Sequence, residues 1–243
     1  MLATLDGEMT TPHADPDMLA DPKALRAVPI HERPKPRMRG RLHQGAFVAS
    51  IPAGLLLVVL APDARARVAT LIYALTLTGL FGVSAAYHLG DWSESAYARM
   101  RRLDHSMIFV LIAGTYTPYC LLVLQGTIAT IMLIVVWAGA AVGVATKFYR
   151  VDLHVLSGFM YIGLGWTVAI SLPALLRSLD TAETVLLVSG GLLYSVGALA
   201  LATNRPNPCP RTFGYHEVWH TATIAAAACQ YVSILLVVLG LRD

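Results

Sequence analysis

The 243-residue sequence has few charged side chains and few cysteines. Charged residues make up 14% of the chain and hydrophobic residues 56%, whereas an ordinary soluble domain has about 25% charged residues. This composition excludes an ordinary water-soluble globule. The three cysteines, Cys120, Cys209 and Cys229, are odd in number and show no C-x-x-C spacing. Neither a disulfide framework nor a thiolate metal site is therefore indicated.

The N-terminal segment lacks the apolar stretch of a signal peptide. Residues 1–43 instead hold seven of the 18 Lys and Arg residues and six of the 13 prolines. We expect this segment to be a polar, Pro-rich, disordered tail that stays in the cytoplasm. The sequence also contains no phosphate loop, no dinucleotide fingerprint and no internal repeat.

Long apolar runs fill the rest of the chain, residues 44–243. A membrane-spanning helix needs about 20 mostly apolar residues, and seven runs approach or exceed that length. The predicted spans are 44–60, 67–88, 105–124, 127–147, 154–176, 183–203 and 216–241. The sequence therefore predicts an all-α, multi-pass protein of the cell membrane, with no room for a second soluble domain.

The distribution of basic residues predicts the orientation. With the N-terminus inside, 14 of the Lys and Arg residues lie in cytoplasmic segments and four lie outside. The positive-inside rule therefore favours a cytoplasmic N-terminus and, after seven crossings, an outside C-terminus. The formal net charge of +3 is then explained by topology and by anionic lipid, and it does not indicate a nucleic-acid partner.

Ionisable side chains within spans are costly and indicate a functional site by default. His88 ends the second span, Asp104 precedes the third, and His216 and His220 open the seventh. Because these spans alternate in direction, all four residues are predicted to lie in one layer near the cytoplasmic face.

The pair His216 and His220 has the spacing of metal ligands, since residues four apart share one face of a helix. His88 is the natural third ligand, which leaves a fourth position open for water, as in catalytic zinc sites. Ser84 lies one turn before His88 and could hydrogen-bond to the site. Asp104 could orient or deprotonate the water.

Simpler explanations exist for some of these polar residues. Ser84 could be a packing hydroxyl between helices, and Asp104 could cap the third span. His43, His105 and His154 are interpreted as interfacial polar groups. The segment from His216 to His220 also matches the H-E-x-x-H signature, in which Glu217 would be the general base of an intramembrane metalloprotease.

Three motifs together identify a family resemblance. They are Ser84-x-x-x-His88, Leu103-Asp104-His105 leading to Ala113-Gly114-Thr115-Tyr116-Thr117-Pro118, and Gly214-Tyr215-His216-Glu217-x-Trp219-His220. On these motifs, residues 35–241 resemble haemolysin III-type bacterial members of the progestin and adiponectin receptor family. That family is part of a wider group of seven-helix membrane hydrolases that includes the alkaline ceramidases.

The resemblance implies a Zn²⁺ ion near the cytoplasmic leaflet, held by His88, His216 and His220. It also implies that Asp104 and Ser84 surround a zinc-bound water. The function then expected is hydrolysis of a membrane lipid amide or ester, with a role in membrane lipid homeostasis. The alternatives are a membrane-fluidity sensor with structural zinc and a protein partner, and a haemolysin-like pore.

Overall fold

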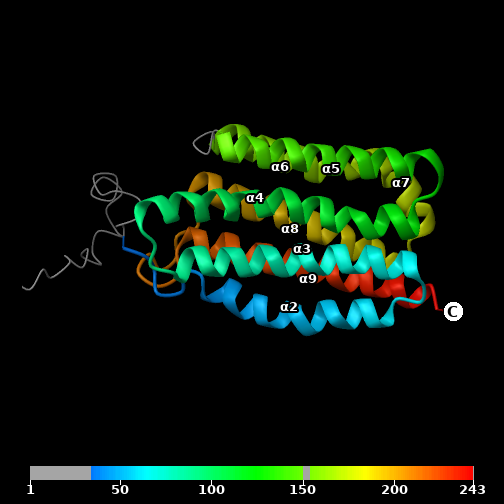
Figure 1. Ribbon diagram of the computed structural model, residues 1–243, viewed down its shortest axis with the longest axis horizontal. Coiled ribbons are helices and arrows are strands. Elements are labelled where there is room, and N and C mark those ends of the chain that lie inside the picture. The colour runs from blue at the N-terminus through cyan, green and yellow to red at the C-terminus, as the bar shows by residue number, and fades with distance from the viewer. Residues whose placement is uncertain (1–33, 150–153, 243) are drawn as a thin grey trace, which may run out of the picture.

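The computed structural model describes residues 34–149 and 154–242, which form a bundle of roughly parallel and antiparallel helices (Figure 1). The helices are α2 (Arg41–Leu60), α3 (Ala64–Leu89), α4 (Glu94–Pro118), η3 (Tyr119–Val123), α5 (Gly126–Tyr149), α6 (His154–Trp166), α7 (Val168–Ser178), α8 (Thr181–Thr203) and α9 (Tyr215–Gly240). Seven stretches of this described part are long and apolar enough to cross a membrane. The all-α, seven-span prediction is thus confirmed.

The packing order of the helices explains which of them can share a site. Helix α9 packs against α8 and α2, α2 packs against α3, α3 against α4, and α4 against α5. Large side chains such as Tyr73, Met132 and Ile234 fill the interior. Helices α2, α3, α4 and α9 therefore form one connected half of the bundle.

Many apolar side chains face outward, including Val135, Phe159 and Val196. In water such a surface would be unfavourable, whereas in a bilayer it contacts lipid tails of the same polarity. The blue segment before α2 lies at one end of the bundle, and the last turn of α9, in red, lies at the other (Figure 1). An odd number of crossings gives this arrangement.

Two spans differ from their predicted form. The third helix begins at Glu94, well before the predicted residue 105, and passes into the π-helix η3 directly after Pro118. The fifth span is divided into α6 and α7 at Thr167. Hydropathy detects only the apolar part of a helix, so it does not reveal the polar first turns of α4.

Of the predicted tail, residues 1–33 lie outside the described residues. Residues 37–40 form a turn, and α2 begins at Arg41. Gly40, at the start of α2, has a φ of 78°, a left-handed conformation that glycine adopts without steric cost. A Cβ atom at Gly40 would lie 2.9 Å from the Cβ atom of His88. The chain before α2 therefore runs directly against the end of α3.

Candidate metal centre

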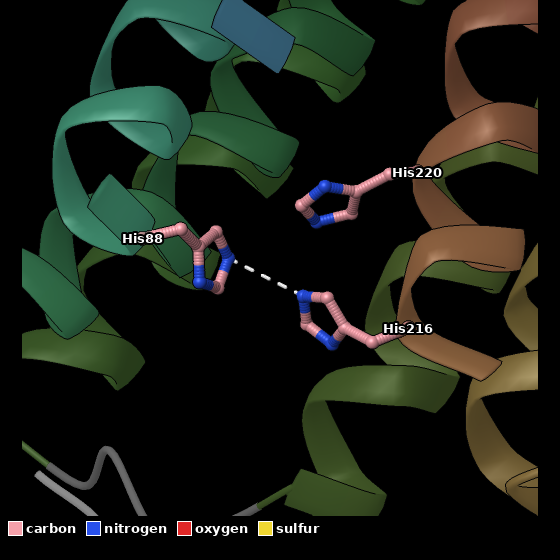
Figure 2. A group of neighbouring side chains, drawn as sticks. All are labelled: His88, His216 and His220. Carbon is pink, nitrogen blue, oxygen red and sulfur yellow. Dashed lines mark hydrogen bonds between the residues drawn. The ribbon is translucent and has the colours of Figure 1, made fainter. Parts of the chain in front are cut away.

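Three histidines from two helices meet inside the bundle (Figure 2). His88 lies in the last turn of α3, and His216 and His220 lie in the first two turns of α9. Each offers one ring nitrogen, and these three atoms all lie within 4.8 Å of one another. The Nε2 atoms of His88 and His216 are 3.3 Å apart. His88 and His220 are buried, and His216 is half-buried.

Two side-chain hydrogen bonds hold the backbone at the start of α9, the turn that carries His216. Glu217 Oε2 accepts a hydrogen bond of 2.8 Å from the backbone N–H of Gly214. Asn207 Oδ1 accepts one of 3.2 Å from the N–H of Tyr215. These side chains satisfy donors that the first turn of a helix leaves unpaired.

Glu217 therefore does not have the role that the H-E-x-x-H signature would give it. Its other oxygen, Oε1, lies 2.6 Å from Nε of Arg39 in an ion pair. The Glu217 side chain is only 1% exposed, and both of its oxygens are occupied. The general base of a metalloprotease is a carboxylate that faces the reacting water. Glu217 does not meet this requirement, so the structure argues against an intramembrane metalloprotease.

The segment 34–40, which we call the N-terminal strap, lies across this end of the site. The backbone N–H groups of Arg37 and Met38 donate hydrogen bonds of 3.1 Å to the carbonyls of Arg211 and Thr212, in the loop before α9. Lys35 Nζ donates one of 3.2 Å to the carbonyl oxygen of His88. The strap thus connects the ends of α2, α3 and α9.

Ser84 and Asp104 form a hydrogen-bonded pair between α3 and α4. Ser84 lies one turn before His88 on α3 and is 3% exposed. Its hydroxyl donates a hydrogen bond to the carboxylate of Asp104. Asp104 lies well inside α4, whose first residue is Glu94. The suggestion that Asp104 caps its helix is wrong, because the helix begins about three turns earlier.

The structure therefore brings the five predicted site residues into two groups. His88, His216 and His220 form the cluster with metal-binding spacing, and no carboxylate belongs to it within the described residues. Asp104 joins α4 to α3 through Ser84, and Ser84 lies one helical turn before His88.

Comparison with known proteins identifies the family of this chain. The sequence profile described as "Haemolysin-III related" matches residues 31–231. The chain belongs to the haemolysin-III-related family. It is 32% identical over 197 residues to the Hemolysin-3 homolog of Bacillus subtilis, and the match covers 79% of this chain and 89% of that protein.

Two further relatives extend the comparison. The Hemolysin-3 of Bacillus cereus is 31% identical over 201 residues, which cover 81% of this chain and 89% of the relative. The human monocyte to macrophage differentiation factor is 27% identical, with 79% of each chain covered. This haemolysin-III-related protein is thus a multi-pass protein of the cell membrane, and the matched region contains all five predicted site residues.

The histidine cluster suits a zinc ion. Zinc binds imidazole nitrogen at about 2.0–2.1 Å in tetrahedral geometry, which places two such ligands about 3.3–3.4 Å apart. The 3.3 Å between the Nε2 atoms of His88 and His216 agrees with this spacing. Three protein ligands also match the usual number at catalytic zinc sites. The residues present therefore fit the ion implied by the sequence.

Two contributors to this region were not identified from the sequence. His43, interpreted as an interfacial group, is 3% exposed and stacks on His220 with 3.8 Å between ring centroids. Arg39 pairs with Glu217. The direction of the first span places His43 in the same layer as His88, His216 and His220. The sequence therefore contained a reason to include His43 in the site. His105 is half-buried, and the side chain of His154 lies outside the described residues.

Proposed function

We propose that this protein is a zinc-dependent integral membrane hydrolase that cleaves a lipid amide or ester near the cytoplasmic leaflet. The observation that carries the proposal is the convergence of three histidine nitrogens within 4.8 Å, together with a carboxylate that accepts a hydrogen bond from Ser84, one turn before His88. Such a combination of ligands and a titratable group is typical of metal-assisted hydrolysis.

His88, His216 and His220 would hold the zinc. When bound, the ion supplies Lewis-acid polarisation of a carbonyl group and lowers the pKa of water. Asp104 receives the proton of the attacking water at a carboxylate oxygen and returns it to the leaving amine or alcohol. The water oxygen is added to the acyl carbon as the C–N or C–O bond breaks. Ser84 orients Asp104 through the hydrogen bond that it donates.

The charge distribution supports a cytoplasmic position for this chemistry. Arg37, Arg39 and Arg211 belong to the strap and to the loop before α9, at the end of the bundle where the histidines lie. Basic residues concentrate on the cytoplasmic side of membrane proteins. A lipid substrate would enter laterally between helices, and such a protein would act in membrane lipid homeostasis.

Metal analysis tests the first part of the proposal. Purified wild-type protein is expected to carry about one zinc per chain, and the variants His88→Ala and His220→Ala are expected to lose it. Metal-free wild-type protein, after purification without chelators, would contradict the proposal.

Lipid analysis of cells tests the catalytic part and does not require the substrate to be identified first. A deletion strain is complemented with wild-type protein or with Asp104→Asn, which keeps the size of the side chain. The expected result is that Asp104→Asn retains zinc, while a lipid amide or ester accumulates as it does in the deletion strain. A normal lipid profile with this variant would contradict catalysis by Asp104.

A second candidate is a membrane-fluidity sensor in which zinc is structural. The observation that favours it is the N-terminal strap, which contacts His88 and the loop before α9 and so covers one side of the cluster. The relatives named haemolysin suggest a pore as a further alternative. Charged or polar rings normally line such a path, and the spans of this sequence carry almost no charge away from the histidine layer.

A further inference from the structure

The fourth histidine near the cluster, His43, comes from a helix that supplies none of the three proposed ligands. It lies in the first turn of α2 and is 3% exposed. One face of its ring stacks on His220, with centroids 3.8 Å apart and planes within 3° of parallel. Phe81 of α3 contacts the ring edge to face, at 5.1 Å and 65°. His43 is thus clamped between α9 and α3.

The geometry of this stack excludes His43 as a ligand of the same ion. An imidazole nitrogen binds a metal through a lone pair that lies in the plane of its ring. Because the rings of His43 and His220 are parallel and stacked, an ion in the plane of His220 lies well outside the plane of His43. The two rings therefore cannot both coordinate it in this arrangement.

Within the part of the chain that the structure describes, no hydrogen bond orients His43. Both of its ring nitrogens are buried, and neither has a hydrogen-bond partner among the described residues. Buried polar atoms in proteins are rarely left in this state, and each such case calls for an explanation. Among the described residues, contacts with the faces and edges of the ring fix its position, and the His220 ring is closer to it than the Phe81 ring.

From this geometry we infer that His43 is a positioning residue of the metal centre. Its ring holds the imidazole of His220 in the plane in which a nitrogen faces His88 and His216. Outer-shell groups that hydrogen-bond to metal ligands and orient them typically change metal affinity or activity about 10- to 100-fold when they are removed, and a stacked ring that fixes the plane of a ligand is expected to act on a similar scale. This inference rests on the proposed zinc centre and adds α2 to the helices that build it.

Two substitutions separate the ring contact from the ring nitrogens. His43→Phe keeps an aromatic ring against His220, whereas His43→Ala removes it. We expect zinc affinity, measured by competition with a chromophoric chelator, to fall on the order of 10-fold in His43→Ala and to stay near the wild-type value in His43→Phe. The visible absorption bands of Co²⁺-loaded protein should shift only in His43→Ala, because they report ligand geometry.

Phe47→Ala is the matched control. Phe47 lies one turn after His43 on α2, and its ring packs at Gly82 of α3. The control removes a ring from the same region, so it should lower thermal stability in detergent without changing zinc affinity or the Co²⁺ spectrum. Equal loss of zinc affinity in Phe47→Ala and His43→Ala would assign the effect to general packing and overturn the inference.

The remaining outcomes are also decisive. Wild-type zinc affinity and an unchanged Co²⁺ spectrum in His43→Ala would overturn the inference while leaving the zinc centre intact. If His43→Phe lost zinc as completely as His220→Ala, His43 would be a ligand and not a positioning residue. Wild-type protein that binds neither Zn²⁺ nor Co²⁺ would overturn the proposed function itself, and this inference with it.

Discussion

Two acidic residues near the histidine cluster have different surroundings. Asp104 accepts a hydrogen bond from Ser84, an interaction that leaves capacity on the carboxylate for a proton and for further hydrogen bonds. Glu217 is bound by Arg39 through one oxygen and by the N–H of Gly214 through the other. The position of Glu217 directly after His216 suggests chemistry from sequence alone, but its contacts make it a structural residue.

This difference predicts opposite results for two conservative substitutions. Asp104→Asn should lower lipid hydrolysis by about 10²- to 10⁴-fold, the usual contribution of a general acid–base group. Glu217→Gln should change hydrolysis only a few-fold, because an amide oxygen can still accept from Gly214. Both variants should retain zinc. Lipid profiles of complemented deletion strains, together with metal analysis, measure this contrast. Normal hydrolysis in Asp104→Asn and lost hydrolysis in Glu217→Gln would show that Glu217, and not Asp104, is the acid–base group.

The ion pair itself predicts a stability effect. Because the Glu217 carboxylate is 1% exposed, Arg39→Ala leaves a buried charge without its partner, a change that typically costs about 3–5 kcal/mol. Thermal unfolding in detergent should show a large loss of stability. The double variant Arg39→Ala with Glu217→Gln removes the unpaired charge and should recover part of that loss. Additive losses would show that the two side chains are not coupled.

The contact between α3 and α4 determines whether Ser84 can reach Asp104. The two helices lie close together where Gly114 of α4 faces Thr76 of α3, because a Cβ atom at Gly114 would overlap the Thr76 side chain. Thr76 is 7% exposed, and its hydroxyl bonds to the carbonyl of Tyr73, so it has little room to move. Small residues allow membrane helices to approach closely in this way.

We therefore expect Gly114→Ala to force α3 and α4 apart. Overpacking of this kind typically costs about 1–3 kcal/mol, and the separation should also weaken the Ser84–Asp104 pair and hence activity. Gly191→Ala is the control, because a Cβ atom at Gly191 of α8 would meet nothing within 4 Å. Equal thermal stability of the two variants would show that the α3–α4 contact tolerates the extra methyl group.

The long apolar runs and the alternation of span direction were sufficient to predict seven helices and the common layer of His88, His216 and His220. Both depend on composition and on counting crossings, which a single sequence contains. The stacking of His43 on His220 depends on how α2 is rotated against α9, and the Arg39–Glu217 pair depends on the path of the strap. Such contacts arise from tertiary packing, which periodicity and hydropathy do not encode.

The orientation of the whole molecule in the membrane is predicted from charge. With a cytoplasmic N-terminus, the connection between α7 and α8 lies outside, and the loop containing Cys209 lies inside. Ala182, at the start of α8, and Cys209 are both exposed, so both can be probed with a membrane-impermeant thiol reagent on intact cells. In a Cys209→Ser background, Ala182→Cys should be labelled, whereas the natural Cys209 should be labelled only after the cells are opened.

The reverse labelling pattern would place the N-terminus and the histidine layer at the outer face. The cluster itself would survive such a result, because α3 and α9 run in opposite directions and would still bring His88 to His216 and His220. What would change is the leaflet from which a lipid enters and the compartment that supplies water. Labelling of both cysteines on intact cells would contradict seven crossings, since a single span, α8, separates Cys209 from Ala182 and must place them on opposite sides of the membrane.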